Sequence, residues 1–237
     1  MVKAFPAGPT GNRLLNLLPP EEYEALHRLV RKVDLAQGQV LYETYAPIDE
    51  IYFPINCVLS AVTVMLDGSA IEVATVGNEG VSGLPAFSRV TTQSPHRVFA
   101  QVAGSALRAD AKAIEHANGG CPKLRETITR YQQAFTFQIS QCVACNGLHV
   151  IIERCCRWLL MTHDRVDGDE LALTHEFLSF MLGVRRSSVT EVLQSLQQQG
   201  LIRYGKGKIT ILNRERLEEL ACECYARVKE EYDRLLG

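Results

Sequence analysis

Two short stretches of helical hydrophobic periodicity meet at Gly183, within the segment from Leu173 to Ile202. The positions expected to face inward are small or apolar: Leu178, Ser179, Leu182, Val184, Val189 and Val192. The positions expected to face outward on the second stretch are charged or hydroxyl-bearing: Arg185, Arg186, Ser187, Ser188, Thr190 and Glu191. This division predicts a helix-turn-helix whose outer side chains grip phosphates and contact base edges. A plain helical hairpin is the alternative.

Between Gln39 and Asp110 the pattern changes to short runs rich in β-branched and aromatic residues. The runs are LYETY, EIYFPI, VLSAVTVML, AIEVATVG, HRVFAQVAG and SALRAD. Turn signals such as Asp67-Gly68-Ser69 and Gly77-Asn78-Glu79-Gly80 separate them. Many short strands at this spacing predict a small antiparallel barrel or sandwich. Before it, Asn12 to Leu35 predicts an amphipathic helical lead-in.

A long helix is predicted to follow the strands. A short helix over Ala111 to Asn118 ends at Gly119-Gly120, and Pro122 fits the first turn of the next helix. Residues spaced by three and four form a heptad seam along it: Ile128, Tyr131, Phe135, Gln138, Cys142, Cys145, His149 and Ile152. A break near Asn146-Gly147 would lead into a further helix, Ile151 to His163.

A hairpin is predicted after the helix-turn-helix, with strands over Leu201 to Tyr204 and Lys208 to Ile211. Its glycines allow close approach to a phosphate backbone, and Lys206 and Lys208 supply positive charge, so we expect a DNA-binding wing. One last helix is expected over Arg214 to Leu236. It carries five basic and seven acidic residues, which argues against DNA contact, and we expect it to pack on its own domain.

The composition narrows the class of protein. A length of 237 residues and a hydrophobic share of 46% allow one large or two modest domains and exclude a disordered chain. The formal net charge is −2, yet Thr174 to Asn213 carries five basic and two acidic residues. The start of the chain lacks an apolar signal core, and the uncharged stretch Tyr131 to Ile152 is too polar for a membrane span. We therefore expect a cytoplasmic protein without membrane contact.

These features together resemble a known family. The run from Gly38 to Gly83, GQVLYETYAPIDEIYFPINCVLSAVTVMLDGSAIEVATVGNEGVSG, resembles the cyclic-nucleotide-binding β-roll of the Crp/Fnr transcription regulators. The helix-turn-helix with its wing resembles their C-terminal winged helix. The order of roll, long helix and winged helix is also that of the family, and the likeness covers about residues 12 to 213.

The resemblance implies an α+β fold in three parts. These are a sensor β-roll over residues 1–120, a dimerisation helix over 121–149, and a winged helix-turn-helix with an extra C-terminal helix over 150–237. It implies a homodimeric regulator, not an enzyme, that binds double-stranded DNA, responds to a small molecule and can contact RNA polymerase. Pairing is expected through Ile128, Tyr131, Phe135, Gln138, Cys142 and Cys145. Arg186 stands at the family position that contacts a base, and we expect guanine as its partner.

The expected nucleotide pocket departs from the family pattern. Members that bind cyclic AMP use a Gly-Glu pair to hold the ribose, but this chain has Gly83-Leu84-Pro85 there, which offers neither a carboxylate nor the proline N–H. Where the family neutralises the phosphate, the chain has His96-Arg97-Val98, with Arg97 out of register and so on the opposite strand face. The effector residues assigned here are Gly83, Leu84, Pro85, His96 and Arg97. They either merely close the roll or bind a ligand other than cyclic AMP.

The eight cysteines, expected to be reduced in the cytosol, offer an alternative function. Cys142 and Cys145 share a helix face with His149 one turn on, so a thiol- or metal-responsive switch there is one hypothesis. Packing of cysteine as a small apolar residue is the other, and no metal ligand is assigned. On one continuous helix, Cys222 and Cys224 would point about two hundred degrees apart and could not share an ion.

Two further cysteine chemistries are excluded by the pattern. The first cysteine is Cys57, so the N-terminal cluster that holds an iron-sulfur centre in some family members is absent. Disulfide exchange at Cys142-x-x-Cys145 is not expected, because the motif lacks the strand-to-helix setting that lowers the pKa of a thiol.

Overall fold

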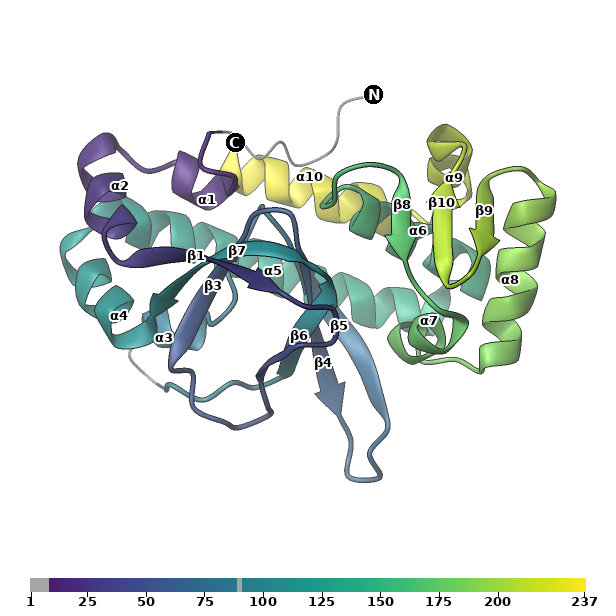
Figure 1. The fold of residues 1–237 in the computed structure, drawn as a ribbon, viewed down its shortest axis with the longest axis horizontal. Helices are drawn as coiled ribbons and strands as arrows, with labels where there is room; N and C mark the ends of the chain where they lie inside the picture. The colour runs from purple at the N-terminus through teal and green to yellow at the C-terminus, as the bar shows by residue number, and fades with distance from the viewer. Residues whose placement is uncertain (1–8, 89–90) are drawn as a thin grey trace.

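A computed structural model describes residues 9–88 and 91–237. A β-roll lies at one end of the molecule and a small winged helix-turn-helix unit at the other, and a long helix passes behind both (Figure 1). The first residues of the chain, on which the expectation of a cytoplasmic protein partly rests, lie outside the described residues. The mixed fold with antiparallel sheets agrees with the class predicted from the sequence.

The roll consists of two antiparallel sheets. Its strands are β1 (Val30–Leu35), β2 (Val40–Tyr42), β3 (Glu50–Pro54), β4 (Val58–Val64), β5 (Ala70–Val76), β6 (Arg97–Val102) and β7 (Gly104–Asp110). The strand orders are β1-β7-β3 and β2-β6-β4-β5. Five successive residues of β4, Val58 to Val62, are buried. Since side chains alternate between the two faces of a strand, both faces of β4 are covered.

The helical lead-in predicted over Asn12 to Leu35 is only partly correct. The structure has α1 (Arg13–Asn16) and α2 (Pro20–His27), and the chain then enters β1. Asn12 caps α1, because its side chain accepts hydrogen bonds from the N–H groups of Leu14 and Leu15. The last six residues of the expected lead-in, Val30 to Leu35, form β1 because all of them pair with β7, from Val30 opposite Ala109 to Leu35 opposite Gly104. That partner is distant in sequence, so local periodicity could not reveal it.

The central helices follow the predicted boundaries closely. The short helix α3 (Pro85–Ser88) lies within the roll, between β5 and β6. Between the roll and the wing follow α4 (Ala111–Gly120), α5 (Pro122–Leu148) and α6 (Ile151–His163). The break between α5 and α6 falls at His149 and Val150, which are extended, slightly later than expected. Among the described helices, the 27-residue α5 included, none combines the length and apolarity that crossing a membrane requires.

The predicted helix-turn-helix and wing are present. Their elements are β8 (Glu170–Ala172), α7 (His175–Leu182), α8 (Arg186–Gln198), β9 (Ile202–Gly205) and β10 (Lys208–Ile211), with sheet order β8-β10-β9. Gly183 ends α7 in the left-handed conformation, at φ +62°, and Val184 N–H donates to Ser179 O at 3.0 Å. Lys206 and Gly207 form the two-residue hairpin turn, both with positive φ, as a type I′ turn requires.

The C-terminal segment differs from the single helix expected. It forms α9 (Arg214–Leu220), which packs on α6 of its own domain as expected, and α10 (Cys224–Leu236), which packs mainly along α5. The rings of Tyr232 and Tyr131 lie 6.2 Å apart, and Arg13 Nη2 at α1 lies 2.9 Å from Asp233 Oδ1. Figure 1 shows α10 running back from the winged unit towards the start of the chain. The apolar stripe of α10 is therefore covered by the central helix.

A buried ion pair connects the roll to the winged unit. Arg165, just after α6, and Glu79, in the turn after β5, both have 0% side-chain exposure. Arg165 Nη2 and Nε lie 2.9 and 3.0 Å from Glu79 Oε1, and Nη1 donates to Met161 O at 2.6 Å. A Cβ on Gly77 would lie 2.4 Å from Arg165 Cδ, so only glycine at this position of the turn leaves room for the Arg165 side chain.

A second buried polar group, Glu72 of β5, lies in the same interface. Its oxygens lie 2.7 Å from Trp158 Nε1 and 2.5 Å from Ser60 Oγ. Ser60 Oγ also lies 2.6 Å from Gln101 Oε1, and Gln101 Nε2 donates to Thr162 Oγ1 at 2.9 Å. The Ser60 hydroxyl has a single proton to donate. If it donates this proton to Gln101 Oε1, the hydrogen bond between Ser60 and Glu72 requires a protonated Glu72 carboxyl that donates to Ser60 Oγ. Consistent with this, burial raises the pKa of Glu72 to about 7 against the opposing effect of its hydrogen bonds.

The raised pKa predicts that Glu72 destabilises the fold as pH increases. The folded protein retains the Glu72 proton up to about pH 7, whereas the unfolded chain releases it near the ordinary value of 4.5. Between these values the unfolded state binds fewer protons, so the free energy of unfolding falls, by about 3 kcal/mol in total from this group. Glu72→Gln, which keeps a donor for Ser60 and an acceptor for Trp158, should remove this loss.

Urea denaturation of both proteins from pH 4.5 to 8 measures the effect. The free energy of unfolding of the variant minus that of the wild type should increase with pH through this window. Glu24→Gln, at an exposed position of α2, is the matched control and should give a flat difference. Parallel curves for the wild type and Glu72→Gln would show that Glu72 is ionised throughout.

Candidate functional site

The outer face of α8 carries the polar residues that the sequence singled out. Val189, Val192, Leu193 and Leu196 are buried beneath it, whereas Arg185, Arg186, Ser187 and Glu191 are exposed and Ser188 is partly exposed. Figure 1 shows α8 at the edge of the molecule, away from the roll. Arg185 occupies the N-cap without a side-chain cap hydrogen bond among the described residues. The first turn of α8 can therefore present backbone N–H groups and two guanidinium groups to an anion.

Thr190 is held by the protein itself. Its hydroxyl donates to Arg186 O at 3.0 Å and lies 2.9 Å from His175 Nδ1. Because the hydroxyl proton is used, His175 Nδ1 must donate, which fixes the tautomer of the ring. The ring stacks at 4.3 Å on Tyr204 of β9, and burial, then the charge of Arg186, lowers the pKa of His175. His175, not identified from the sequence, thus connects α7, α8 and the wing.

The wing presents one lysine at its tip and one along its strand. Lys206 is exposed in the turn, at φ +52°. Lys208 Nζ lies 2.6 Å from Glu170 Oε1 of β8, and both side chains are about half exposed. An exposed ion pair of this kind is weak, so Lys208 can exchange its partner for a phosphate at small cost.

The turn of the helix-turn-helix also contacts the roll. A Cβ on Gly183 would lie 2.8 Å from Ile71 Cδ1 of β5, so the α7–α8 turn and the β4–β5 hairpin are in close contact. A shallow hollow beside this contact is lined by residues of both units, including Met65, Phe180 and Arg185. The turn that leads into α8 is thus in direct contact with the roll.

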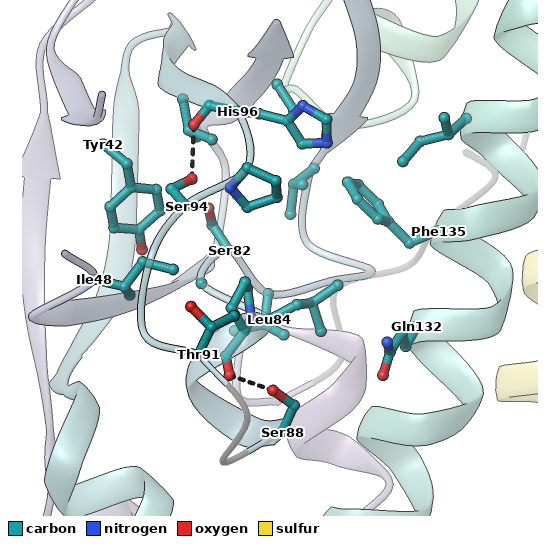
Figure 2. A pocket seen from close by; sticks show the side chains of 18 of the residues that line it. Tyr42, Ile48, Ser82, Leu84, Ser88, Thr91, Ser94, His96, Gln132 and Phe135 are labelled. Atoms are coloured by element: carbon teal, nitrogen blue, oxygen red, sulfur yellow. Dashed lines mark hydrogen bonds between the residues drawn. The ribbon is translucent and has the colours of Figure 1, made fainter. Parts of the chain in front are cut away.

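The roll contains a cavity of about 350 Å³ that opens towards α5 (Figure 2). Its apolar lining consists of Ile48, Ala61, Val76, Val81, Leu84, Pro85, Pro95, Val98, Phe135 and Ile139. Its polar lining among the described residues consists of Tyr42, Ser82, Ser88, Thr91, Ser94, His96, Gln132 and Thr136. Figure 2 shows Phe135 and Gln132 on the helix side of the space and Tyr42 and Ile48 on the roll side. A ligand here would touch both the sensor roll and the central helix.

Four of the five assigned effector residues line this cavity, and Arg97 does not. Gly83, Leu84, Pro85 and His96 contribute to the wall, whereas Arg97 lies on the opposite strand face, with Nε 3.4 Å from Glu43 Oε2. The assignment of Arg97 to the pocket is therefore wrong, because strand alternation points it away. Among the described lining residues there is neither a carboxylate nor a guanidinium or ammonium group. Burial also lowers the pKa of His96, which favours its neutral form.

The predicted dimer seam faces the interior of the protomer. Ile128, Tyr131, Gln138, Cys142 and Cys145 are buried within a single chain, and Phe135 is partly buried beside the cavity. Gln138 Nε2, for example, donates to Thr75 O of the roll at 3.0 Å. The heptad pattern correctly identified a packing face of α5. The expected partner of this face was a second subunit, but the roll and α10 of the same chain cover it.

Three cysteines and a histidine come together at the end of α5. They are Cys145, His149, Cys222 and Cys224, and the sulfur and ring nitrogen atoms that could bind a metal lie within 4.8 Å of one another. Cys142, assigned with Cys145 and His149 from the sequence, is not among them, and its Sγ lies 3.5 Å from Arg157 Nη1. The expectation that Cys222 and Cys224 lie on one helix is also wrong, because α9 ends at Leu220 and α10 begins at Cys224.

Comparison with known proteins agrees with this architecture. Residues 153–220 match the Crp-like helix-turn-helix domain. The fold is similar to that of FixK2 from Bradyrhizobium japonicum, with a TM-score of 0.68 and 18% identity over 82% of this chain and 98% of that chain. A CRP/FNR family transcriptional regulator from Thermus thermophilus gives a TM-score of 0.63 and 21% identity, covering 81% and 98% of the two chains. No curated protein sequence matches the chain.

A third similar structure is the c-di-GMP responsive global regulator CLP of Xanthomonas campestris, with a TM-score of 0.63 and 12% identity over 81% of this chain and 99% of that chain. The chain therefore has the fold of Crp/Fnr-type transcription regulators and carries a Crp-like helix-turn-helix domain, as the resemblance in its sequence implied. At these identities the similarity defines the fold, and the ligand and DNA site have to be inferred from the residues of this chain.

Proposed function

We propose that this protein is a homodimeric, sequence-specific DNA-binding transcription regulator whose effector is not cyclic AMP. The observation that carries the proposal is the exposed first turn of α8, where Arg185, Arg186 and Ser187 project from a Crp-like helix-turn-helix. Guanidinium groups donate to both phosphates and guanine edges, and α8 is long enough to lie in a major groove. The wing adds Lys206 and Lys208 as contacts to the DNA backbone.

The surface that supports dimer formation is the exposed face of α5. Its members follow one another at alternating spacings of four and three: Thr129, Gln133, Thr136, Ser140, Val143 and Gly147. All are uncharged, and the stripe continues into apolar side chains that are largely exposed, with Val143 at 66% and Leu148 at 81%. A heptad stripe of this kind on a 27-residue helix fits pairing with the same helix of a second copy.

The hydroxyl groups of this stripe are already hydrogen-bonded within the helix. Thr129, Thr136 and Ser140 each donate to the carbonyl oxygen four residues earlier, at 2.8 to 3.0 Å. Their donors need no partner across an interface, so the stripe presents mainly carbon atoms and can be buried with little desolvation cost. A two-fold axis along α5 would place the two α8 helices on one side of the dimer, suited to half-sites about 34 Å apart on a palindromic operator.

The cavity in the roll supports an uncharged or weakly polar effector. Its described lining is largely apolar, and its polar groups are hydroxyls, one amide and one histidine whose pKa is lowered by burial. A cyclic nucleotide would bring a phosphate charge that these groups cannot neutralise. Because Gln132, Phe135 and Thr136 belong to α5, a bound ligand would contact the helix that also forms the proposed dimer.

Selection of DNA sequences bound by the purified protein, followed by affinity measurements, tests the DNA-binding role. The selected site should be palindromic. Arg186→Ala should weaken binding to that site by about 1 to 3 kcal/mol and relax specificity at one base position per half-site, because a bidentate contact to guanine is lost. Arg216→Ala, the same change on an exposed position of α9, is the control and should leave the base preference unchanged. Equal losses of Arg186→Ala on all sequences would contradict base recognition.

The dimer surface is tested by Ser140→Arg. Placing a charge near the proposed two-fold axis brings two like charges together and buries them, so the dimer should dissociate into monomers in sedimentation equilibrium. Ser69→Arg, at the exposed tip of the β4–β5 hairpin, makes the same change away from α5 and should remain dimeric. An unaltered dimer of Ser140→Arg would place the interface elsewhere.

The effector chemistry is tested by thermal unfolding with ligands. Cyclic AMP at millimolar concentration should leave Tm unchanged, since a ligand raises Tm only by binding the folded state. Small uncharged, largely apolar compounds should include some that raise Tm, and Gln132→Trp, which fills the helix side of the cavity from a position outside the proposed dimer stripe, should abolish their effect. A rise in Tm with cyclic AMP that Gln132→Trp also removes would contradict the assigned ligand class.

A further inference from the structure

The cluster of Cys145, His149, Cys222 and Cys224 is separate from the DNA-binding face and from the cavity. Cys145 Sγ lies 3.5 Å from Cys222 Sγ, and Cys224 Sγ lies 3.5 Å from His149 Nδ1. Cys145 lies in the last turn of α5 and His149 directly follows the helix, while Cys222 precedes α10 and Cys224 is its first residue. Two segments 77 residues apart in sequence thus each supply two ligand-type atoms to one point.

The spacing of these atoms suits a tetrahedral ion. With Zn–S bonds of about 2.3 Å and Zn–N bonds of about 2.0 Å, ligand atoms around zinc lie roughly 3.5 to 3.8 Å apart. Two of the pairs are 3.5 Å apart, and all four ligand atoms lie within 4.8 Å of one another. Side-chain rotations that move atoms by about 1 Å would close the set around one ion. The interruption between α9 and α10 makes this possible, because it frees Cys222 and Cys224 from helical spacing.

The surroundings differ from an ordinary apolar core. Cys145, Cys222 and Cys224 form a buried cluster of their own, detached from the main hydrophobic core. Cysteines that pack simply as small apolar residues would be expected among leucine and valine side chains. Here the neighbours are hydrogen-bond donors, since Gln141 Nε2 donates to Cys224 Sγ at 3.1 Å. An N–H donor directed at the sulfur also suits a metal-bound thiolate, which keeps lone pairs that accept hydrogen bonds from its surroundings.

The other histidine nitrogen is oriented by a carboxylate. Nε2 of His149 lies 3.1 Å from Glu223 Oε2, so in the neutral ring with Nε2–H donating to Glu223 the lone pair of Nδ1 faces the sulfurs. A histidine that binds a metal usually donates its second nitrogen to a carboxylate or carbonyl in this way. The charge is also compensated, because three thiolates and a divalent ion leave one negative charge and the buried Arg157 lies near Cys142 on the same side of α5.

We propose that Cys145, His149, Cys222 and Cys224 bind one Zn²⁺ ion through three thiolates and His149 Nδ1. Three soft sulfur ligands and an imidazole select zinc over magnesium or calcium. With four protein ligands the site is closed, which is the arrangement of a structural rather than a catalytic zinc. The ion would fix the start of α10 to the end of α5, next to the break at His149 and Val150 where the central helix meets the winged unit.

Metal analysis of the full-length protein tests the proposal. Protein purified anaerobically with a reductant and without chelator should contain about one Zn²⁺ per chain. After removal of zinc, Co²⁺ alone should bind with the visible absorption of a tetrahedral thiolate complex and saturate at about one equivalent. Removal of the ion should lower Tm, and addition of Zn²⁺ should restore it.

Variants distinguish these ligands from the other cysteines. Cys222→Ser and His149→Ala should lose the Co²⁺ spectrum or shift it to fewer sulfur ligands, while Cys142→Ala, three residues from Cys145, should keep it. Glu223→Gln should weaken zinc binding by about 10- to 100-fold. Glu223 is 67% exposed, so this variant should fold normally, and Glu219→Gln on the exposed face of α9 is its control, with wild-type affinity expected.

Several results would overturn the proposal. The first is a wild-type protein that contains no zinc and gives no tetrahedral Co²⁺ spectrum after reduction. The second is a Co²⁺ spectrum that is unchanged in Cys222→Ser and His149→Ala. The third is loss of the Co²⁺ spectrum in Cys142→Ala. Thiol titration of the freshly purified, denatured protein provides a further check. All eight thiols should react once zinc is removed. Two fewer in the wild type, with no such deficit in Cys222→Ser beyond its missing thiol, would show a disulfide of Cys222 in place of a metal site.

Discussion

The fully buried ion pair between Arg165 and Glu79 constrains how the two halves of the molecule fit together. A charge with 0% exposure is tolerated only when its partner saturates it, and here the guanidinium donates to both carboxylate oxygens and to Met161 O. The pair therefore holds the end of α6 against the turn that follows β5. Since α6 supports the helix-turn-helix, the placement of the recognition helix depends on a carboxylate that belongs to the sensor roll.

The long helix α5 connects the remaining functions. One face of it lines the cavity through Phe135, another packs on α10 through Tyr131, and a third is exposed and uncharged. A ligand, a second subunit and the C-terminal helix would thus all act on one rigid element. The proposed zinc site lies at the end of this element, so it would stabilise the joint between α5 and the winged unit.

Much of the fold could be predicted because its signals are local. The short β-rich runs became strands, and the helices beginning at Pro122 and Ile151 start where the sequence placed them. The exceptions have non-local causes. Val30 to Leu35 is a strand because β7 supplies its hydrogen-bond partners, and the expected final helix is interrupted between Leu220 and Cys224, where α10 turns onto α5. Sequence periodicity contains no information about such distant partners.

The sequence by itself determined the helix-turn-helix and the wing. Apolar spacing, a glycine that adopts positive φ at Gly183 and a Lys206-Gly207 turn are properties of neighbouring residues, and they suffice to define these elements and their exposed basic side chains. Only the tertiary structure decided which face of α5 is free, and that Cys145 lies against Cys222 of a distant segment. These outcomes depend on the path of the chain between distant segments, because a side chain's partner is set by packing as well as by its own spacing.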